Sequence, residues 1–480
     1  MSIARKVAQN SGVIIAGYFA ESILNFILFV TLARYFGSDG FGKISFLSVF
    51  FFFISSTDNL LIRPILVREM ARDKNNSPFI IGNGLIIRLL FAFIAVIFLW
   101  IAVWAAGSPV DVVPLAYFIS LSLIVSSLAS SYETIFEVNL RMWYFKLINL
   151  LALSSTLGGL FILIYLKAGL LHFCGLYLVL SLGALISIRH YAGKLIRPEF
   201  KIYFLLWRKI FRESWPLFLT SVFIFIYHRI DQVMLLRIRG AEEVGAYAAA
   251  VKLAEILNII PIALKVSILP LMSVCFSACR ERFVRVYRLS FKYLLCFIIP
   301  VAVWCGIFSG KIIALIYGAK FASSSAALSI LIWAEVFVFV GVINNAILIA
   351  TNKQVLDPLF TGASAAVNII LNLLLIPRYG FVGAAASSLI SCAVGPVMGY
   401  FIKTTRPYSK SMLYYSLKPL CAALVMFLCV YPLRDLFWVS LLASPAIYLL
   451  VIYFIRGIDK EDRRLLKSIV PALNKYVEQK

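Results

Sequence analysis

The chain contains fourteen apolar segments of about twenty residues, and these segments limit the folds that it can adopt. A helix of about 20 apolar residues crosses the roughly 30 Å hydrocarbon core of a bilayer, so each segment is long enough for one crossing. The apolar runs are continuous and lack the period-2 alternation of a membrane β-strand. The sequence therefore predicts an all-α, polytopic membrane protein. The segments are residues 11–33, 43–64, 79–104, 112–132, 143–166, 169–188, 215–236, 244–275, 291–315, 326–350, 357–377, 380–402, 411–433 and 436–455.

The charge distribution predicts how the chain lies in the membrane. The chain is 62% hydrophobic, only 14% charged, and has a formal net charge of +23. Its densest basic blocks, 189–212, 280–292 and 456–480, fall on one side if both termini are cytoplasmic. This is the positive-inside bias, and such blocks contact anionic lipid rather than nucleic acid. We expect a multi-pass membrane protein whose first segment is retained as a helix.

Several functional classes are disfavoured by what the sequence lacks. The eight cysteines form no CxxC pair, so we expect no metal site, no disulfide and no cofactor. The G-x-x-x-x-G-K-[ST] phosphate-binding motif is absent, so this chain is not expected to hydrolyse ATP. The loops expected outside the membrane have about ten residues or fewer, too short for a catalytic domain. We expect a transporter and not an enzyme.

A weak internal repeat predicts two halves. The stretch RYFGSDGFG from Arg34 and the stretch RIRGAEEVG from Arg237 share arginine, glycine, acidic residue and glycine at an offset of 203. A second pair, Lys167-Ala-Gly169 and Arg378-Tyr-Gly380, has an offset of 211. Six spans per half would relate the halves by an axis along the membrane normal, with the working site between them near the midplane. The predicted division is an N-terminal lobe (1–190), a basic cytoplasmic linker (191–214), a C-terminal lobe (215–405), two additional helices (406–456) and a basic cytoplasmic tail (457–480).

Charged residues inside the spans are the candidates for function. The stretch IYHRIDQVML carries His228, Arg229 and Asp231 near the middle of the seventh span, where a charge costs about 2.5–3.5 kcal/mol. His228 and Asp231 are three residues apart and share a helix face, whereas Arg229 projects towards another helix or an aqueous space. Lys252 and Glu255 share a face of the alanine-rich eighth span. Each group can serve transport or form a structural ion pair.

Other ionisable residues complete this set. Glu21, Arg88 and Glu335 lie within spans, and Arg88 can alternatively extend to the cytoplasmic surface. Asp58 and Arg63 lie in the inner third of the second span, where pairing or extension to the surface is the alternative to transport. Arginine binds phosphate through two parallel hydrogen bonds. A cation-leaning site between two lobes therefore indicates an anionic headgroup.

Four stretches resemble a known family. The run from Asp231 to Glu255, DQVMLLRIRGAEEVGAYAAAVKLAE, and the run NIILNLLLIPRYGFVGAAASSLIS from Asn368 are similar to signatures of the polysaccharide-transport branch of the multidrug/oligosaccharidyl-lipid/polysaccharide exporter superfamily. LARYFGSDGFG and DNLLIRPILVREMAR are similar to the family's first two helices. The resemblance covers most of residues 10–400 and is closest to the O-antigen (Wzx-type) flippases. The last two helices resemble those of the fourteen-span lipid II flippases.

The resemblance implies a flippase of the bacterial inner membrane. Its cargo would be a lipid-linked oligosaccharide on an undecaprenyl diphosphate carrier, moved by alternating access and driven by a proton or sodium gradient, for lipopolysaccharide O-antigen or another surface polysaccharide. Expected partners are this cargo, membrane lipids, a polysaccharide polymerase and chain-length proteins, with no nucleic acid. One alternative is a cation or drug exporter of the same superfamily, whose cavity would be rich in carboxylates. The other is a membrane polysaccharide polymerase or ligase.

This reading assigns expected roles to the charged residues. The diphosphate would be contacted by Arg88, Arg229 and Lys252. The groups expected to tune these cations or to carry a coupling proton are His228, Asp231, Glu255 and Glu21. Histidine is included because its side chain titrates near neutral pH.

Overall fold

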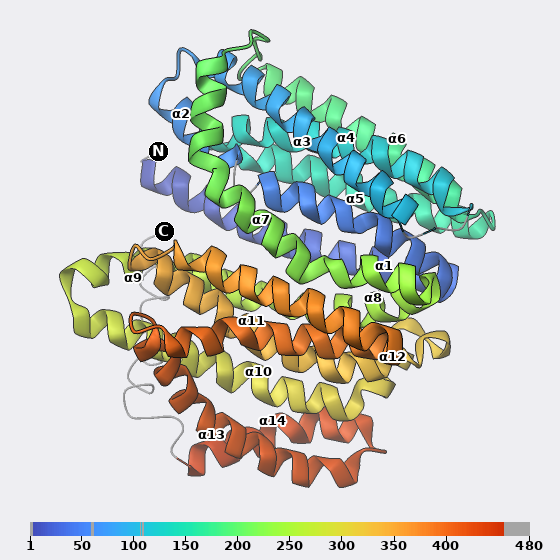
Figure 1. The fold of residues 1–480 in the computed structure, drawn as a ribbon, viewed down its shortest axis with the longest axis vertical. Helices are drawn as coiled ribbons and strands as arrows, with labels where there is room; N and C mark the ends of the chain where they lie inside the picture. The colour runs from blue at the N-terminus through green and yellow to red at the C-terminus, as the bar shows by residue number, and fades with distance from the viewer. Residues whose placement is uncertain (1–2, 59–61, 106, 108–109, 456–480) are drawn as a thin grey trace.

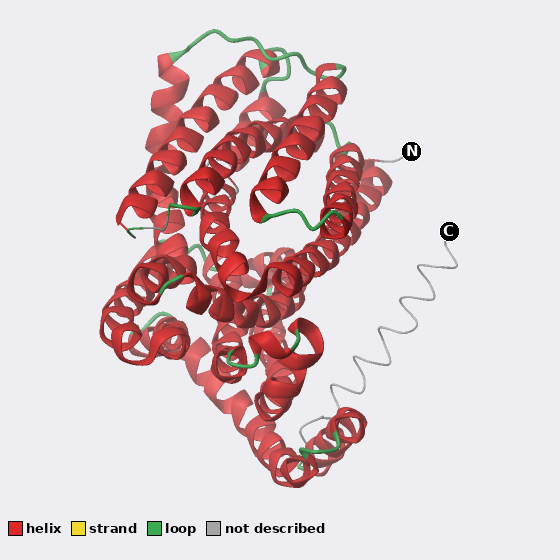
Figure 2. Ribbon diagram, turned by 90° about the vertical axis from the view of Figure 1, so that its right-hand side faces the viewer, coloured by secondary structure: helices red, strands yellow, loops and turns green. Residues whose placement is uncertain are grey.

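The computed structural model describes residues 3–58, 62–105, 107 and 110–455 of the 480-residue chain. Across these residues the chain forms α-helices joined by short loops, and no strand is present in them (Figure 2). The basic tail expected at 457–480 lies outside the described residues. The helices are α1 (Ile3–Thr57), α2 (Arg63–Arg72), α3 (Ser77–Ala105), α4 (Val112–Val138), α5 (Met142–Tyr165), α6 (Leu170–Gly193), α7 (Phe204–Arg239), α8 (Ala241–Glu255), α9 (Ile259–Ala278), α10 (Arg280–Tyr317), α11 (Ser324–Ala350), α12 (Leu356–Phe401), α13 (Arg406–Val430) and α14 (Phe437–Phe454).

Twelve segments of the described chain are long and apolar enough to span a bilayer. Two of them, Gly17–Thr57 and Leu356–Phe401, have 41 and 46 residues, about twice the length that one crossing needs. Each is broken by a glycine with a positive φ, Gly37 in α1 (71°) and Gly380 in α12 (56°). Each broken segment therefore provides two crossings, and the prediction of about fourteen spans is confirmed.

The first sequence echo corresponds to the same local break in both halves. Gly37 interrupts α1, and Gly240, with φ at 92°, separates α7 from α8. Glycine adopts this left-handed backbone without the steric penalty of a side chain. The second echo is not matched in conformation, because Gly169 has φ at −80° whereas Gly380 has φ at 56°. Only the first pair of glycines thus shares a left-handed backbone, although both glycines of the second pair also lie where a helix begins or breaks.

The helices gather in two groups (Figure 1). Helix α1 and helices α3–α6 lie in the upper part of the view, and α8–α12 lie in the lower part. Helix α7 runs from the upper group to the middle and packs extensively on α12. Helices α13 and α14 lie at the outer edge of the lower group. The two groups meet where α1 packs along α8, whose run of alanines from Ala248 to Ala250 allows close approach.

The connection between α6 and α7 is tied to α3. Its non-helical part spans only residues 194–203, because α6 and α7 extend into the linker expected at 191–214. The side-chain amide of Asn83 donates to the carbonyl of Lys201 at 2.9 Å. Its oxygen accepts from the Tyr203 amide at 3.1 Å and from the Trp207 indole at 2.8 Å. The linker is thus fixed to the N-terminal helices by the buried Asn83.

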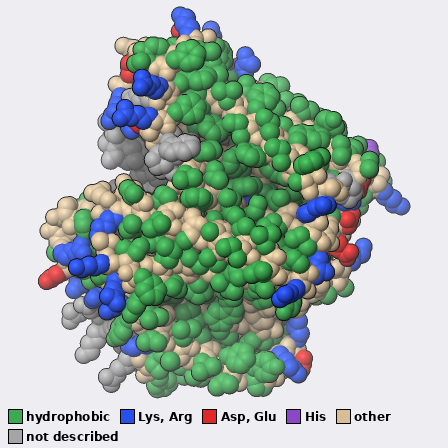
Figure 3. Space-filling view, in the orientation of Figure 1, with side chains coloured by type: hydrophobic (Ala, Val, Ile, Leu, Met, Phe, Trp, Pro, Cys, Tyr) green, Lys and Arg blue, Asp and Glu red, His purple; other side chains and the backbone are tan. Residues whose placement is uncertain are grey.

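Hydrophobic side chains cover the outside of the helix bundle. Figure 3 shows a broad apolar band across the middle of the visible face, with Lys, Arg, Asp and Glu towards the two ends of the helices. This distribution suits a surface that faces lipid hydrocarbon in the middle and water at both ends. With the spans described above, it identifies the chain as a multi-pass membrane protein.

Candidate functional site

A cluster of three charged side chains lies between α1, α7 and α8. The Arg229 guanidinium is 2.9 Å and 3.1 Å from the two carboxylate oxygens of Glu255. The Lys252 ammonium lies 4.0 Å from the same carboxylate, so the expected proximity of Lys252 and Glu255 is observed. A quarter of the side-chain surface of Lys252 and Glu255 is exposed, whereas only 9% of that of Arg229 is. Two cations therefore share one carboxylate at a partly accessible position.

Aromatic rings of α1 support both cations. The Arg229 guanidinium carbon lies 4.7 Å from the centroid of the Phe52 ring, and the Lys252 nitrogen lies 4.4 Å from that of Phe29. Such cation–π contacts stabilise a partly desolvated cation without neutralising it. The His228 ring also packs against Phe52, with 5.8 Å between the two ring centroids. The site thus combines α1 with the α7 residues that the sequence marked.

His228 and Asp231 do not form the pair that their spacing suggested. Asp231 instead accepts hydrogen bonds from the Tyr247 hydroxyl, from the backbone amide of Gln232 at 2.7 Å and from the Ser388 hydroxyl at 3.3 Å. Residues three apart share a helix face, but packing decides which partner each side chain meets. Here the nearer donors on α8 and α12 bind Asp231. Asp231 is only 2% exposed, and its hydrogen bonds connect α7, α8 and α12.

The helix carrying Lys252 and Glu255 loses its regular geometry directly after the cluster. Residues Ile256–Asn258 form a 3₁₀ turn between α8 and α9. Pro261 follows and has no N–H to donate to the carbonyl of Leu257, which weakens the helix at this point. A short 3₁₀ stretch within a long helix often marks a hinge. The cluster therefore lies next to an irregular point of this span.

Arg88, also expected to contact the diphosphate, lies apart from the accessible cluster. It is 1% exposed and forms an ion pair with Asp58. It also donates to the Ser131 carbonyl and to the Thr134 hydroxyl, both at 3.1 Å. All three guanidinium nitrogens thus bond to protein acceptors, and we assign Arg88 to the packing of α3 on α4. Arg63 similarly pairs with two glutamates of α4.

Glu21 pairs with a lysine that the sequence did not single out. The Lys146 ammonium of α5 donates to the Glu21 carboxylate of α1 at 2.8 Å and lies 3.6 Å from the centroid of the Tyr18 ring. Lys146 is 4% exposed, so this ion pair is largely withdrawn from water. Glu335 of α11 is also buried, at 6% exposure. Glu21 lies apart from the accessible cluster around Arg229, whereas Glu335 is close enough to interact electrostatically with Glu255 and Arg229.

At the end of the bundle where α1 bends, the two groups of helices are in direct backbone contact. A β-carbon at Gly42 would overlap the Ala241 carbonyl, and one at Gly245 would overlap the Ser38 carbonyl. These two glycines are equivalent in the repeated stretches, so the contact is reciprocal. Arg34 donates to the carbonyls of Ile316 and Leu315 at the end of α10, both at 2.6 Å.

Further contacts close this same end. Arg239 donates to the carbonyl of Pro377 at 2.7 Å, next to the break in α12. The Phe381 amide, just beyond the break, donates to the Glu243 carboxylate at 3.0 Å. Backbone groups freed at the glycine breaks are thereby satisfied by charged side chains of α7 and α8. These contacts close the end of the helix bundle opposite the one that carries the basic linker.

Metal coordination finds no support among the described residues. No group of three or more His, Cys, Asp or Glu side chains in that part of the chain is placed to hold a metal ion. None of the cysteines in that part of the chain forms a disulfide bond.

Comparison with known proteins gives the family. The model of the family described as polysaccharide biosynthesis protein matches residues 7–276, more than half of the chain. The chain belongs to this family. A second family model, MatE, matches residues 216–374 of the chain. The expected membership in the exporter superfamily is thereby confirmed.

One curated relative carries a functional description. The chain is 26% identical over 288 residues to Agl15 of Haloferax volcanii, described as a "probable low-salt glycan biosynthesis flippase". The match spans 59% of this chain and 60% of the relative.

Solved structures show the same fold. The lipid II flippase MurJ in an inward closed conformation superposes with a TM-score of 0.73 at 18% identity, covering 92% of this chain and 98% of that one. An inward-facing multidrug resistance transporter of the MATE family and MOP superfamily gives a TM-score of 0.67 at 13% identity, over 82% and 96% of the two chains. All these relatives are transporters by name, in agreement with the prediction of a transporter rather than an enzyme.

Several residues of the site were not found from the sequence. Phe29, Phe52, Tyr247 and Ser388 are ordinary residues of apolar spans, and only tertiary packing brings them to charged partners. Lys146 lies near the start of α5, where a lysine normally extends to the membrane surface. A search for charged residues near span ends would have included Lys146 among others, but none of these four uncharged residues.

Proposed function

We propose that this protein is a flippase for a lipid-linked glycan and works by alternating access. The observation that carries the proposal is the accessible cluster in which Arg229 and Lys252 share the single carboxylate of Glu255. Two cations held together at a partly exposed position within apolar helices favour an anionic ligand, and the forked guanidinium suits phosphate oxygens. Membership in the polysaccharide biosynthesis family supports a glycan attached to that anion.

The proposed cargo is an oligosaccharide on a polyprenyl diphosphate, such as undecaprenyl diphosphate, in a bacterial inner membrane with both termini in the cytoplasm. Arg229 and Lys252 would contact the diphosphate, and their ion pairs with Glu255 would be replaced by contacts with the phosphate oxygens. We do not extend this role to Arg88, because its nitrogens already bond to protein acceptors. The transported glycan would serve O-antigen or another surface polysaccharide, alongside a polymerase and chain-length proteins.

The proposed driving force is an ion gradient. Asp231 is the best-placed carboxylate for coupling, because its hydrogen bonds with Tyr247 and Ser388 join α7, α8 and α12. Binding or loss of a cation there would change how these three helices pack. Glu255 would couple through the cations that it shares. His228 and Glu21 would act by positioning neighbouring groups, since His228 packs on Phe52 and Glu21 pairs with Lys146.

The test compares anionic with cationic cargo. Purified protein in proteoliposomes is supplied with a fluorescent polyprenyl diphosphate-linked oligosaccharide, and an impermeant quencher reports its movement between leaflets. Parallel vesicles carry a cationic dye. We expect glycan lipid movement that increases under an imposed proton or sodium gradient, with no dye transport. Dye transport without glycan lipid movement would instead identify a cation exporter.

A further inference from the structure

A second site lies at the outer side of the N-terminal helices, away from the cluster around Arg229. It is a pocket of about 750 Å³ between α3, α4, the end of α6 and the linker that follows α6. The central cluster is built by α1, α7 and α8 and shares none of these lining residues. The pocket is therefore a separate feature, and nothing in the proposed transport step uses it.

One wall of the pocket is basic. It is formed by the exposed side chains of Arg189, His190, Lys194 and Arg197, over two turns at the end of α6 and the start of the linker. None of the four forms an ion pair with a residue in the described part of the chain. The Lys194 nitrogen lies 5.1 Å from the centroid of the Tyr191 ring. No acidic side chain lines the pocket.

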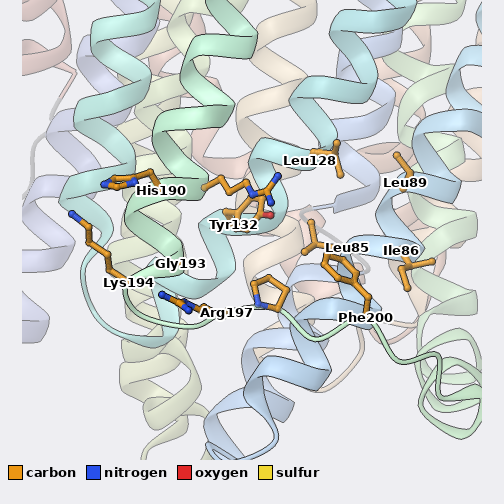
Figure 4. Close-up of a pocket in the computed structure, with 12 residues that line it drawn as sticks. Leu85, Ile86, Leu89, Leu128, Tyr132, His190, Gly193, Lys194, Arg197 and Phe200 are labelled. Atoms are coloured by element: carbon orange, nitrogen blue, oxygen red, sulfur yellow. The ribbon is translucent and has the colours of Figure 1, made fainter.

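The opposite wall is apolar. It is formed by Leu85, Ile86 and Leu89 of α3, with Phe200 of the linker closing it from below. Figure 4 shows these four side chains on one side of the pocket and His190, Lys194 and Arg197 on the other, with Tyr132 between them. Phe200 is 66% exposed, a large apolar ring left open at the pocket edge. A ligand that fills this pocket must present an anion to one wall and hydrocarbon to the other.

The position of the pocket agrees with a lipid ligand. Helix α6 is a membrane span of which only 17% of the most apolar stretch is buried, so most of its surface faces lipid. The basic wall begins where this span ends, at the level expected for lipid headgroups. Basic pockets between transmembrane helices on the cytoplasmic side are suited to anionic headgroups.

From these observations we propose that the pocket binds an anionic phospholipid of the surrounding membrane. Its phosphate lies against Arg189 and Arg197, and the first carbons of an acyl chain lie against Leu89 and Phe200. The bound lipid would join the linker to α3 from outside, at the same place where Asn83 joins them from inside. This proposal does not depend on which cargo the central cluster transports.

Native mass spectrometry of the full-length protein in a neutral detergent tests the proposal. Dioleoyl phosphatidylglycerol and dioleoyl phosphatidylcholine have the same chains and differ in net charge. We expect tight binding of phosphatidylglycerol only. Arg189→Gln with Arg197→Gln should weaken it by about 25-fold, roughly fivefold for each arginine. The control pair Arg282→Gln with Arg288→Gln removes two exposed arginines of α10 outside the pocket and should leave binding unchanged.

Two further arms distinguish the sources of phosphate. Phe200→Ala should weaken binding of phosphatidylglycerol, whereas glycerol 1-phosphate, which has no chains, should fail to displace the lipid. Displacement by glycerol 1-phosphate at similar concentrations would overturn the proposal in favour of a free-anion site. Equal binding of the two phospholipids, or equal loss in both arginine pairs, would also overturn it. A pocket that binds a polyprenyl diphosphate but not phosphatidylglycerol would also overturn the proposal, because it would then be a cargo site.

Discussion

Adding one methyl group at Gly42 should open the closed end of the molecule. A β-carbon at this position would lie 2.8 Å from the Ala241 carbonyl carbon and 2.9 Å from the Gly245 nitrogen. These are backbone atoms of α8, so no side chain can rotate to make room. Helices α1 and α8 must separate, and the cost falls on the conformation in which they touch.

The size of the effect follows from the cost of overpacking. Inserting a methyl group into a tightly packed contact costs about 1–3 kcal/mol. If the opposite conformation lacks this contact, the ratio of closed to open molecules falls by about 5- to 150-fold. Gly310→Ala is the matched control, because a β-carbon at Gly310 in α10 would meet no atom within 4 Å. It adds the same methyl group to a membrane helix without the clash.

Distance measurement across the closed end checks this prediction. Spin labels at Tyr165→Cys and Lys320→Cys, in a background without the native cysteines, lie on exposed positions of the two groups of helices at this end. Electron–electron double resonance should show a longer distance population in Gly42→Ala and none in Gly310→Ala. An unchanged distance distribution in Gly42→Ala would refute the reasoning that this backbone contact holds the end closed.

Two further predictions concern buried polar groups. Arg88→Leu leaves the Asp58 carboxylate buried without its cation, which should cost about 3–5 kcal/mol and lower the melting temperature of the purified protein. Arg88→Leu with Asp58→Leu should recover part of that loss, and no recovery would count against the ion pair. Asn83→Ala removes three hydrogen bonds to the linker and should speed proteolytic cleavage within residues 194–203, measured by limited proteolysis. Cleavage at the wild-type rate would mean that other contacts hold the linker.

The fold was largely predictable from the sequence, because burial in a bilayer imposes long apolar helices. The spans lie where apolar runs of about twenty residues occur, and the repeated glycines mark the breaks at Gly37 and Gly240. The break at Gly380 also falls at the boundary between two predicted spans, 357–377 and 380–402, although the similar Gly169 lies at an ordinary turn with φ at −80°. A glycine permits a left-handed backbone, but only the surrounding packing requires it.

The site was predictable only in part. The spacing of Lys252 and Glu255 predicted their contact, and the two-residue spacing of Arg229 and Asp231 correctly directed Arg229 towards another helix. That helix and its acceptor, Glu255, depend on how α7 packs on α8. The same holds for His228: Asp231 lies on the same helix face, but its carboxylate is bonded by Tyr247 and Ser388 of other helices. Local spacing specifies a face and not the partner across it.

The most direct test of the proposed function is transport of the polyprenyl diphosphate-linked oligosaccharide by Arg229 variants in proteoliposomes, with protein amounts matched. Arg229→Ala should abolish movement, and Arg229→Lys should restore only part of it, since an ammonium cannot make the forked contact with phosphate. The exposed Arg282→Ala should behave as wild type. Full transport by Arg229→Ala, with the protein folded and inserted, would contradict the claim that this arginine binds the cargo.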